Sequence, residues 1–339
     1  MPTVSVITPT YNRADVLPRA IESVRRQTFR DYEHIVVNDG STDDTPAVVA
    51  EYDDDRIEYV DLPNNCGAAA ARNRGLERVR GEYVTFLDSD DAYHPDRLAI
   101  TTTALDAQPD HVAGVFHPLV KVSGDNESVR KTPTGEITLD ELVTANVICG
   151  LPNSAYRSRA CDAVGGFDES LAYAEDYDLQ LRLLREFTMV GIDEALVRCY
   201  GDVEGLSNDP LKVRQGLTSL LNKHREMLSD RNIADRHRRI GATYLRTGDE
   251  ETARDHFEKA VDLWRDSYDR SVYELIGRTC LEVGHRPLAR RYLCAALRRN
   301  PLAYRSYVLL LATFAPVEGQ GAVTTLKSTR DGIISNIKI

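Results

Sequence analysis

The 339-residue sequence predicts an α/β domain with a mostly parallel sheet, followed by an all-α module of helical repeats. Strand and helix patterns alternate over about the first 90 residues, which is typical of right-handed βαβ crossovers. Small residues recur with a period of 36 between residues 241 and 300, which is typical of stacked helix hairpins. The region between them is less regular and contains one strong helical pattern, residues 174–187.

The first domain is expected to contain four parallel strands, at residues 3–8, 33–39, 56–62 and 82–88. Helices are expected between them, at residues 14–28, 45–52 and 67–79. Polar or acidic residues follow each strand, and the carboxyl ends of parallel strands share one edge of the sheet. A ligand site is therefore expected at that edge.

The 36-residue repeat aligns six positions of residues 241–264 with six of residues 277–300. Small residues at such positions let two helices approach closely. The expected division is a first domain at 1–209, a connecting helix at 210–232, repeats at 233–317 and a flexible tail at 318–339.

Composition excludes several classes of protein. The net charge of −11 argues against a nucleic-acid partner, because phosphate contacts need clustered Lys and Arg. No apolar run is long enough to span a membrane, and the N-terminus lacks a signal-peptide pattern. The six cysteines contain no C-x-x-C pair, which favours reduced thiols. We expect a cytoplasmic protein, at most peripherally associated with the inner face of the membrane.

Three carboxylates crowd together where the fourth strand ends, at Asp88, Asp90 and Asp91. Hard divalent cations such as Mg²⁺ or Mn²⁺ bind one or two carboxylates and leave sites for substrate phosphates. The alternative is a turn and helix start, in which Asp91 or Asp96 precedes a helix near Pro95. The position after a strand, beside other strand-end acids, favours the cation.

Other candidates also have two interpretations. Asp39 could bind a nucleobase or ribose, or could simply form the turn before Gly40. Arg72 could pair with a diphosphate or with the acidic cluster, or could be a solvated side chain on a helix. Glu175 and Asp176 begin the 174–187 helix. A carboxylate at this position could be a general base, or could simply be favoured there by the helix dipole.

Together these segments resemble family 2 glycosyltransferases of the GT-A fold, a Rossmann-like fold, over residues 3 to about 207. The repeats resemble a degenerate tetratricopeptide pattern. The matching motifs are VSVITPTYNR (4–13), VVNDGSTDDT (36–45), NNCGAAAARNRGL (64–76), GEYVTFLDSDDAYHPDRL (81–98), GGFDE (165–169) and AEDYDLQLRL (174–183).

The resemblance implies a nucleotide-sugar donor, a bound Mg²⁺ or Mn²⁺, and inversion at the anomeric carbon. It implies Asp176 as the catalytic base, and Asp90 together with Asp88 as the D-x-D metal ligands. The implied nucleotide-sugar contacts are Pro9, Thr10, Tyr11, Asn12, Asp39, Arg72, Asp88 and Ser89. The implied acceptor side is Glu175, Gly166 and Phe167.

One position departs from the family pattern. Many relatives have a His after the last core strand, where this sequence has Gly201 and Asp202. The chain also lacks Q-x-x-R-W, so a processive polysaccharide synthase is not expected.

The resulting hypothesis is an inverting hexosyltransferase that moves one sugar from a UDP-sugar or related donor. Its acceptor would be a hydroxyl on a glycan or a lipid-linked oligosaccharide, and its repeats could recruit a protein partner. The alternative is a non-catalytic nucleotide-sugar-binding scaffold that recruits pathway partners. A sugar-nucleotide pyrophosphorylase would need a Gly-rich basic loop after the first strand, and TPTYNR is not one.

Overall fold

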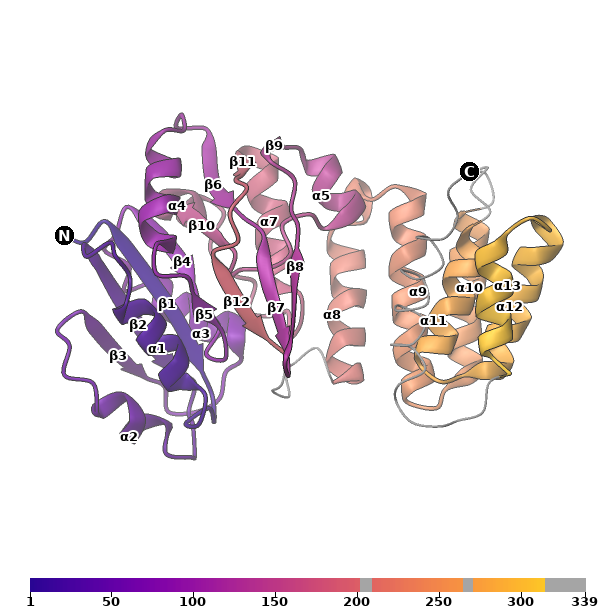
Figure 1. The fold of residues 1–339 in the computed structure, drawn as a ribbon, viewed down its shortest axis with the longest axis horizontal. Coiled ribbons are helices and arrows are strands. Elements are labelled where there is room, and N and C mark those ends of the chain that lie inside the picture. Colours follow the sequence, from indigo (N-terminus) through magenta and orange to yellow (C-terminus); the bar gives the residue numbers. More distant parts are fainter. Residues whose placement is uncertain (202–208, 265–270, 315–339) are drawn as a thin grey trace. The chain divides into compact units, whose positions relative to one another are not determined.

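The computed structural model describes residues 1–201, 209–264 and 271–314. Contacts divide the chain into two compact units, Met1–Leu220 and Leu221–Ile339, and each is considered by itself. The first is an α/β domain and the second is entirely helical over its described residues, which confirms the predicted fold class (Figure 1).

The main sheet of the first unit has eight strands in the order β3-β2-β1-β4-β10-β6-β11-β9. Its strands are β1 (Val4–Thr10), β2 (Tyr32–Asn38), β3 (Ile57–Asp61), β4 (Tyr83–Phe86), β6 (Val112–Phe116), β9 (Gly135–Ile137), β10 (Ser154–Arg157) and β11 (Thr188–Gly191). A second sheet, in the order β5-β12-β7-β8, contains β5 (Ala92–Tyr93), β7 (Leu119–Ser123), β8 (Asn126–Arg130) and β12 (Val197–Tyr200). Strands β1, β2, β3 and β4 all run parallel to one another. Their carboxyl ends therefore lie at the same edge of the sheet.

Helices cover both faces of the parallel strands. The helices of this part of the chain are α1 (Leu17–Arg25), α2 (Thr45–Ala50), α3 (Ala68–Leu76), α4 (Arg97–Asp106), α5 (Leu139–Ala145), α6 (Ser158–Ala163), α7 (Glu175–Glu186) and α8 (Pro210–Lys223). The apolar side of α1 packs with Val36 of β2. On the other face α3 approaches β1 so closely that a Cβ on Gly75 would lie 2.5 Å from Ile7 Cγ2.

The helix expected at residues 14–28 is shorter in the structure. The backbone N–H groups of Val16 and Leu17 both donate to the Arg13 carbonyl, which makes a turn before α1 begins. Similarly, β1 extends past residue 8 to Thr10, because its ladder with β2 continues to Asn38. A local turn sets the first boundary and a neighbouring strand sets the second, and sequence periodicity reveals neither.

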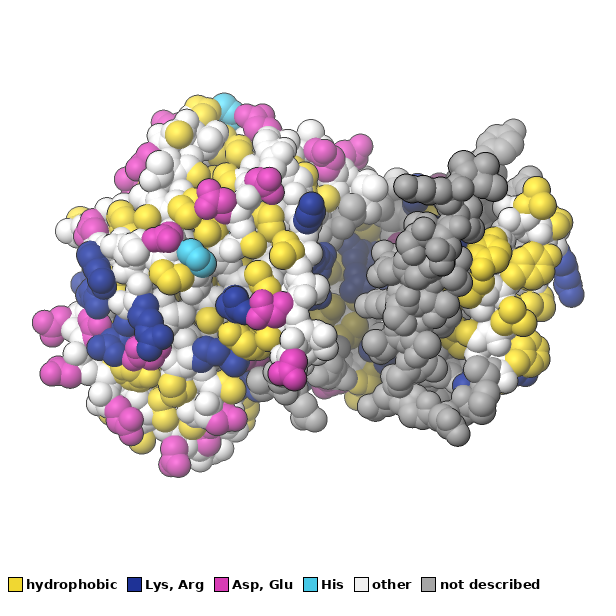
Figure 2. All heavy atoms as spheres, in the orientation of Figure 1, with side chains coloured by type: hydrophobic (Ala, Val, Ile, Leu, Met, Phe, Trp, Pro, Cys, Tyr) yellow, Lys and Arg dark blue, Asp and Glu magenta, His cyan; other side chains and the backbone are white. Residues whose placement is uncertain are grey.

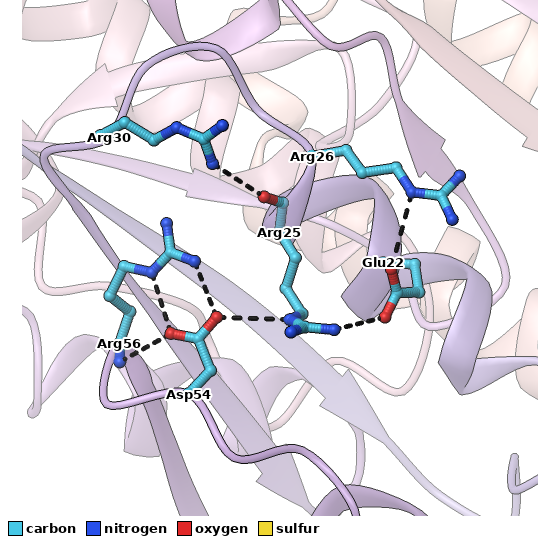
Figure 3. A network of polar contacts seen from close by, with 6 residues as sticks. All are labelled: Glu22, Arg25, Arg26, Arg30, Asp54 and Arg56. Carbon is cyan, nitrogen blue, oxygen red and sulfur yellow. Dashed lines mark hydrogen bonds and ion pairs between the residues drawn. The ribbon is translucent and has the colours of Figure 1, made fainter.

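An ion-pair network fixes the end of α1 to the loops before β2 and β3 (Figure 3). Asp54 accepts from Arg56 at 2.7 and 2.9 Å and from Arg25 at 3.3 Å. The hydrogen bonds from Arg56 hold the pKa of Asp54 well below its usual value. Glu22 binds the other side of Arg25, and the Arg25 carbonyl accepts from Arg30. The network lies near the amino ends of β2 and β3, which leaves the carboxyl edge for other chemistry.

The second unit consists of helix hairpins that follow the sequence repeat. After a 3₁₀ turn (Arg225–Met227) its helices are α9 (Asp230–Arg246), α10 (Glu250–Leu263), α11 (Ser271–Glu282), α12 (Arg286–Arg299) and α13 (Tyr304–Ala312). Gly248 and Gly284, 36 residues apart, end α9 and α11 with φ of 84° and 80°. Gly241 lies against Phe257, as Gly277 lies against Leu293. Both hairpins therefore close in the same way.

Two expectations fall on residues that the structure does not describe. The tail expected at 318–339 is one, and the end of the repeat segment beyond Phe314 is the other. Within the described ranges, the helices are all too short or too polar to cross a membrane.

Truncating Phe257 should selectively destabilise the helical unit. Its ring is fully buried against Gly241, so Phe257→Ala should cost about 3–5 kcal/mol of unfolding free energy. Amide hydrogen exchange should accelerate in α9 to α12 and stay unchanged in β1 to β4. Arg278→Ala, at an exposed side chain of α11, is the matched control and should change little. Equal acceleration in both units would contradict this expectation.

Candidate active site

The acidic cluster lies in a turn at the carboxyl end of β4. The Asp91 N–H donates to the Asp88 carbonyl at 3.0 Å, and β5 follows at once. Asp91 therefore does not begin a helix. Asp96 is the residue before α4, and its side chain makes no capping hydrogen bond.

Arg72 joins the acidic turn to the start of α7. Its guanidinium donates to Asp88 Oδ1 at 2.8 Å and to Glu175 Oε1 at 2.6 Å. Glu175 is 103 residues away along the chain, and its side chain is as enclosed as that of Arg72. The two carboxylates raise the pKa of Arg72 against the opposing effect of burial, so the group stays charged. The ion pair with Asp88 agrees with the acidic-cluster alternative for Arg72, whereas the second ion pair, with Glu175, was not expected from the sequence.

The other two aspartates of the turn have different surroundings. Burial, together with the charge of Asp88, raises the pKa of Asp90. Asp91 is more buried and accepts from the Tyr200 N–H at 3.0 Å, and burial also raises its pKa. Arg19 donates to the Asp90 carbonyl and stacks on the Tyr200 ring at 3.7 Å. Asp91 thus fastens the turn to β12, whereas Asp90 carries negative charge that protein cations only partly offset.

Asp39, after β2, organises the loop that leads into α3. Its two oxygens accept from the N–H groups of Cys66 and Gly67 at 2.7 and 2.9 Å. Burial raises the pKa of Asp39, and these two hydrogen bonds act in the opposite direction. Each carboxylate oxygen can accept a second hydrogen bond, so Asp39 can hold this loop and still receive one from a ligand.

The segment after β1 borders the same edge. Asn12 has φ of 51°, and its Oδ1 accepts from the Thr42 N–H at 2.8 Å, which ties the loops after β1 and β2 together. Tyr11 is 42% exposed beside it. Pro9 and Thr10 complete β1, and Ser89 is buried in the acidic turn.

The residue before helix α7 has a left-handed backbone conformation. Ala174, before the helix, has φ of 63°, a left-handed conformation that costs an alanine about 1–2 kcal/mol. Asp176 follows in the first turn, and its Oδ1 accepts its neighbour Tyr177's N–H at 2.7 Å. Burial and the charge of Glu175 raise the pKa of Asp176 to about 6. A carboxylate poised at this pKa can take up a proton near neutral pH.

Sequence reasoning missed Asn73, which holds the GGFDE turn. Its amide accepts from the Phe167 N–H at 2.8 Å and donates to the Phe167 carbonyl at 2.9 Å. A Cβ on Gly166 would lie 2.7 Å from Asn73 Oδ1, so the turn needs glycine there. Phe167 in turn packs edge-on against Phe86 at 5.1 Å and covers Arg72. The one feature of the sequence that could have pointed to Asn73 is its position next to Arg72.

The sequence-predicted donor set for a cation is Asp88 and Asp90. Among the residues that the structure describes, no group of three or more His, Cys, Asp or Glu is arranged to hold a metal ion. Two carboxylates fit an ion that completes its shell with phosphate and water. The expectation for Asp202 lies outside the described residues.

Comparisons with known proteins identify the family. The sequence model described as glycosyl transferase family 2 matches residues 5–165. An uncharacterized glycosyltransferase of Haemophilus influenzae is 31% identical over 201 residues, which cover 58% of this chain and 67% of that protein. The succinoglycan biosynthesis protein ExoO of Rhizobium meliloti is 35% identical over 192 residues, or 53% of this chain and 55% of that protein.

The fold has a solved counterpart. Residues 1–349 of S. aureus TarS, crystallised with UDP-GlcNAc, superimpose with a TM-score of 0.55 at 20% identity, covering 98% of this chain and 92% of that one. At this identity the likeness establishes the GT-A fold alone. The chain belongs to glycosyl transferase family 2 and is a glycosyltransferase. Several other relatives are matched over only 39–63% of their own length.

Removing the Arg72 guanidinium should destabilise the first unit. Arg72→Met leaves the enclosed Glu175 carboxylate unpaired, which should cost about 3–5 kcal/mol in urea unfolding. The double variant Arg72→Met, Glu175→Gln should recover part of that loss because the stranded charge is gone. Arg74→Met, exposed on the same helix, should stay within about 0.5 kcal/mol of wild type. If the destabilisation of the double variant equals the sum of those of Arg72→Met and Glu175→Gln alone, Arg72 and Glu175 are not coupled.

Proposed function

We propose that this chain is a metal-dependent inverting hexosyltransferase. It transfers one sugar from a nucleotide-sugar donor, with UDP-sugar as the first candidate, to an acceptor hydroxyl. The observation that carries the proposal is the Arg72 bridge, which links the D-x-D turn to the helix start that bears Asp176. An inverting transfer needs these two acidic stations, one for the leaving group and one for the incoming hydroxyl.

The donor side of the proposed site is the strand edge. Asp39 and the residues 9–12 would contact the nucleoside, where the loops after β1 and β2 are tied together. Arg72 and Ser89 would face the diphosphate-sugar. The UDP-GlcNAc complex of TarS supports a uridine nucleotide as the first donor to test.

Asp90 and Asp88 are the proposed ligands of Mg²⁺ or Mn²⁺. The raised pKa of Asp90 supports this role, since a group whose charge is destabilised by burial and by a neighbouring carboxylate gains most from a bound cation. When bound, the metal would supply positive charge to the diphosphate as it leaves. Arg19 would keep Asp90 in place through the Asp90 carbonyl.

Asp176 is the proposed general base, which takes the proton of the acceptor hydroxyl during attack at the anomeric carbon. Glu175 beside it is fixed by Arg72, so Glu175 would position the helix start. Gly166 and Phe167 would border the acceptor. Asn73 would hold them through the Phe167 backbone.

The remaining assignments concern the acceptor and the modules. A glycan or lipid-linked oligosaccharide is the proposed acceptor, and the name of ExoO supports glycan assembly. The proposed modules are the donor-binding domain at 1–209, the connector at 210–232 and tetratricopeptide-like repeats at 233–317. The contact boundary at Leu220 and Leu221 falls within that connector. A cytoplasmic location and a protein partner for the repeats are also proposed.

Two variants should separate the two acidic stations. Asp176→Asn should lower kcat about 10²–10⁴-fold but still bind UDP in the presence of Mn²⁺. Asp90→Ala should weaken UDP binding with Mn²⁺ at least about tenfold in calorimetry. Asp96→Ala, an exposed carboxylate nearby, is the control for both. Equal UDP affinity in the two variants would reject this division of roles, and full sugar transfer by both would reject Asp176 as the base and Asp90 as a metal ligand.

The pH dependence should reveal the raised pKa of Asp176. The base acts when deprotonated, so kcat/KM should fall about tenfold per pH unit below pH 6. Glu175→Gln removes a charge that raises this pKa, so its acidic limb should move to lower pH. Glu186→Gln, exposed at the far end of α7, should leave the profile unchanged. A profile that is flat from pH 5 to 8 would exclude Asp176 as the titrating base.

A further inference from the structure

The end of the helical unit carries a cluster of exposed apolar side chains. Five of the large hydrophobic side chains that are exposed lie on or beside α13, and Figure 2 shows yellow side chains gathered there. They are Leu302 (91% exposed), Tyr304 (63%), Tyr307 (46%), Leu311 (71%) and Phe314 (64%). Tyr304, Tyr307, Leu311 and Phe314 follow helical spacing, so they share one face. We refer to these five residues as the α13 patch.

The same segment is strongly basic in an acidic protein. Residues 286–314 contain six arginines and no Asp or Glu, whereas the whole chain has a net charge of −11. Arg290 stacks on the Phe314 ring at 4.0 Å and donates to the Thr313 carbonyl, which places a cation against the patch. Arg298 and Arg305 are exposed on α12 and α13.

The patch is separate from a hollow in the same unit. The hollow of about 370 Å³ in this unit is lined by α10, α11 and α12, and includes the acidic Glu258 and Asp262. None of the five patch residues contributes to its lining. Surfaces that enter the headgroup region of a bilayer combine tyrosine, phenylalanine and leucine side chains with nearby arginines. A lipid surface needs no preformed cavity, and anionic lipids complement the arginines.

We propose that α12 and α13 form a docking surface for an anionic lipid membrane. The arginines bind the headgroups while the α13 patch enters the boundary with the acyl chains. This inference is independent of the donor chemistry proposed above. If it holds, the helical unit brings the enzyme to a membrane.

The test is co-sedimentation of the full chain with vesicles. Wild type should bind vesicles of phosphatidylcholine and phosphatidylglycerol, bind phosphatidylcholine alone much less, and be released by high salt. Arg298→Glu with Arg305→Glu should lower the partition coefficient about 30-fold or more. Tyr304→Ser with Leu311→Ser should lower it about tenfold at constant charge.

The control must change charge equally elsewhere in the same unit. Arg246→Glu with Arg278→Glu does so on α9 and α11, and should retain binding. All variants should keep wild-type circular dichroism and donor hydrolysis, which excludes unfolding. The proposal is overturned by an equal loss in the control, by equal binding to neutral vesicles, or by no binding. A dimer would also overturn the proposal. In that case the protein would not bind vesicles, and sedimentation velocity would show a dimer that the double variant Tyr304→Ser, Leu311→Ser dissociates, because a second copy covers the patch.

Discussion

The site depends on one buried cation with two anionic partners. Arg72 is the group that brings the end of β4 and the start of α7 together, although Asp88 and Glu175 are far apart in sequence. An enclosed guanidinium is costly unless paired, so burial and pairing make this geometry strongly preferred. The small residues of α3 let the helix lie close enough to the sheet for Arg72 to reach both partners.

That pairing also divides the acidic residues by task. Arg72 forms ion pairs with Glu175 and Asp88. Burial, together with negative charge that is not fully offset, keeps the pKa values of Asp90 and Asp176 raised. Asp91 is tied to the Tyr200 backbone and serves the fold. Such uncompensated charge is what the proposed site would need in order to receive both a cation and a proton. If every acidic residue formed an ion pair, the folded domain would be more stable, but no carboxylate would remain to bind a ligand or accept a proton.

The parallel strands and the edge where their polar ends meet could be predicted from residue patterns, since period and turn chemistry are local. The strand-end acids Asp39, Asp88 and Asp90 were found for the same reason. The pairing of Arg72 with the acidic cluster was among the alternatives that the sequence left open. Its pairing with Glu175 and the clamp of Asn73 on Phe167 could not be predicted, because they join segments 103 and 94 residues apart. Nor does sequence alone show that Asp39 holds the loop before α3, or that Ala174 takes a left-handed conformation. Long-range contacts decide these roles.

Charge is distributed along the chain in a way that suits its parts. The first unit concentrates carboxylates at one sheet edge, where donor phosphates would be repelled unless a cation and Arg72 were present. The last hairpin does the opposite, with arginines and no acids over residues 286–314. A uniformly acidic surface would keep the whole molecule away from anionic lipid. At the end of the helical unit, by contrast, arginines without acidic neighbours in the sequence adjoin exposed apolar side chains, and the proposed attraction to anionic lipid would act there.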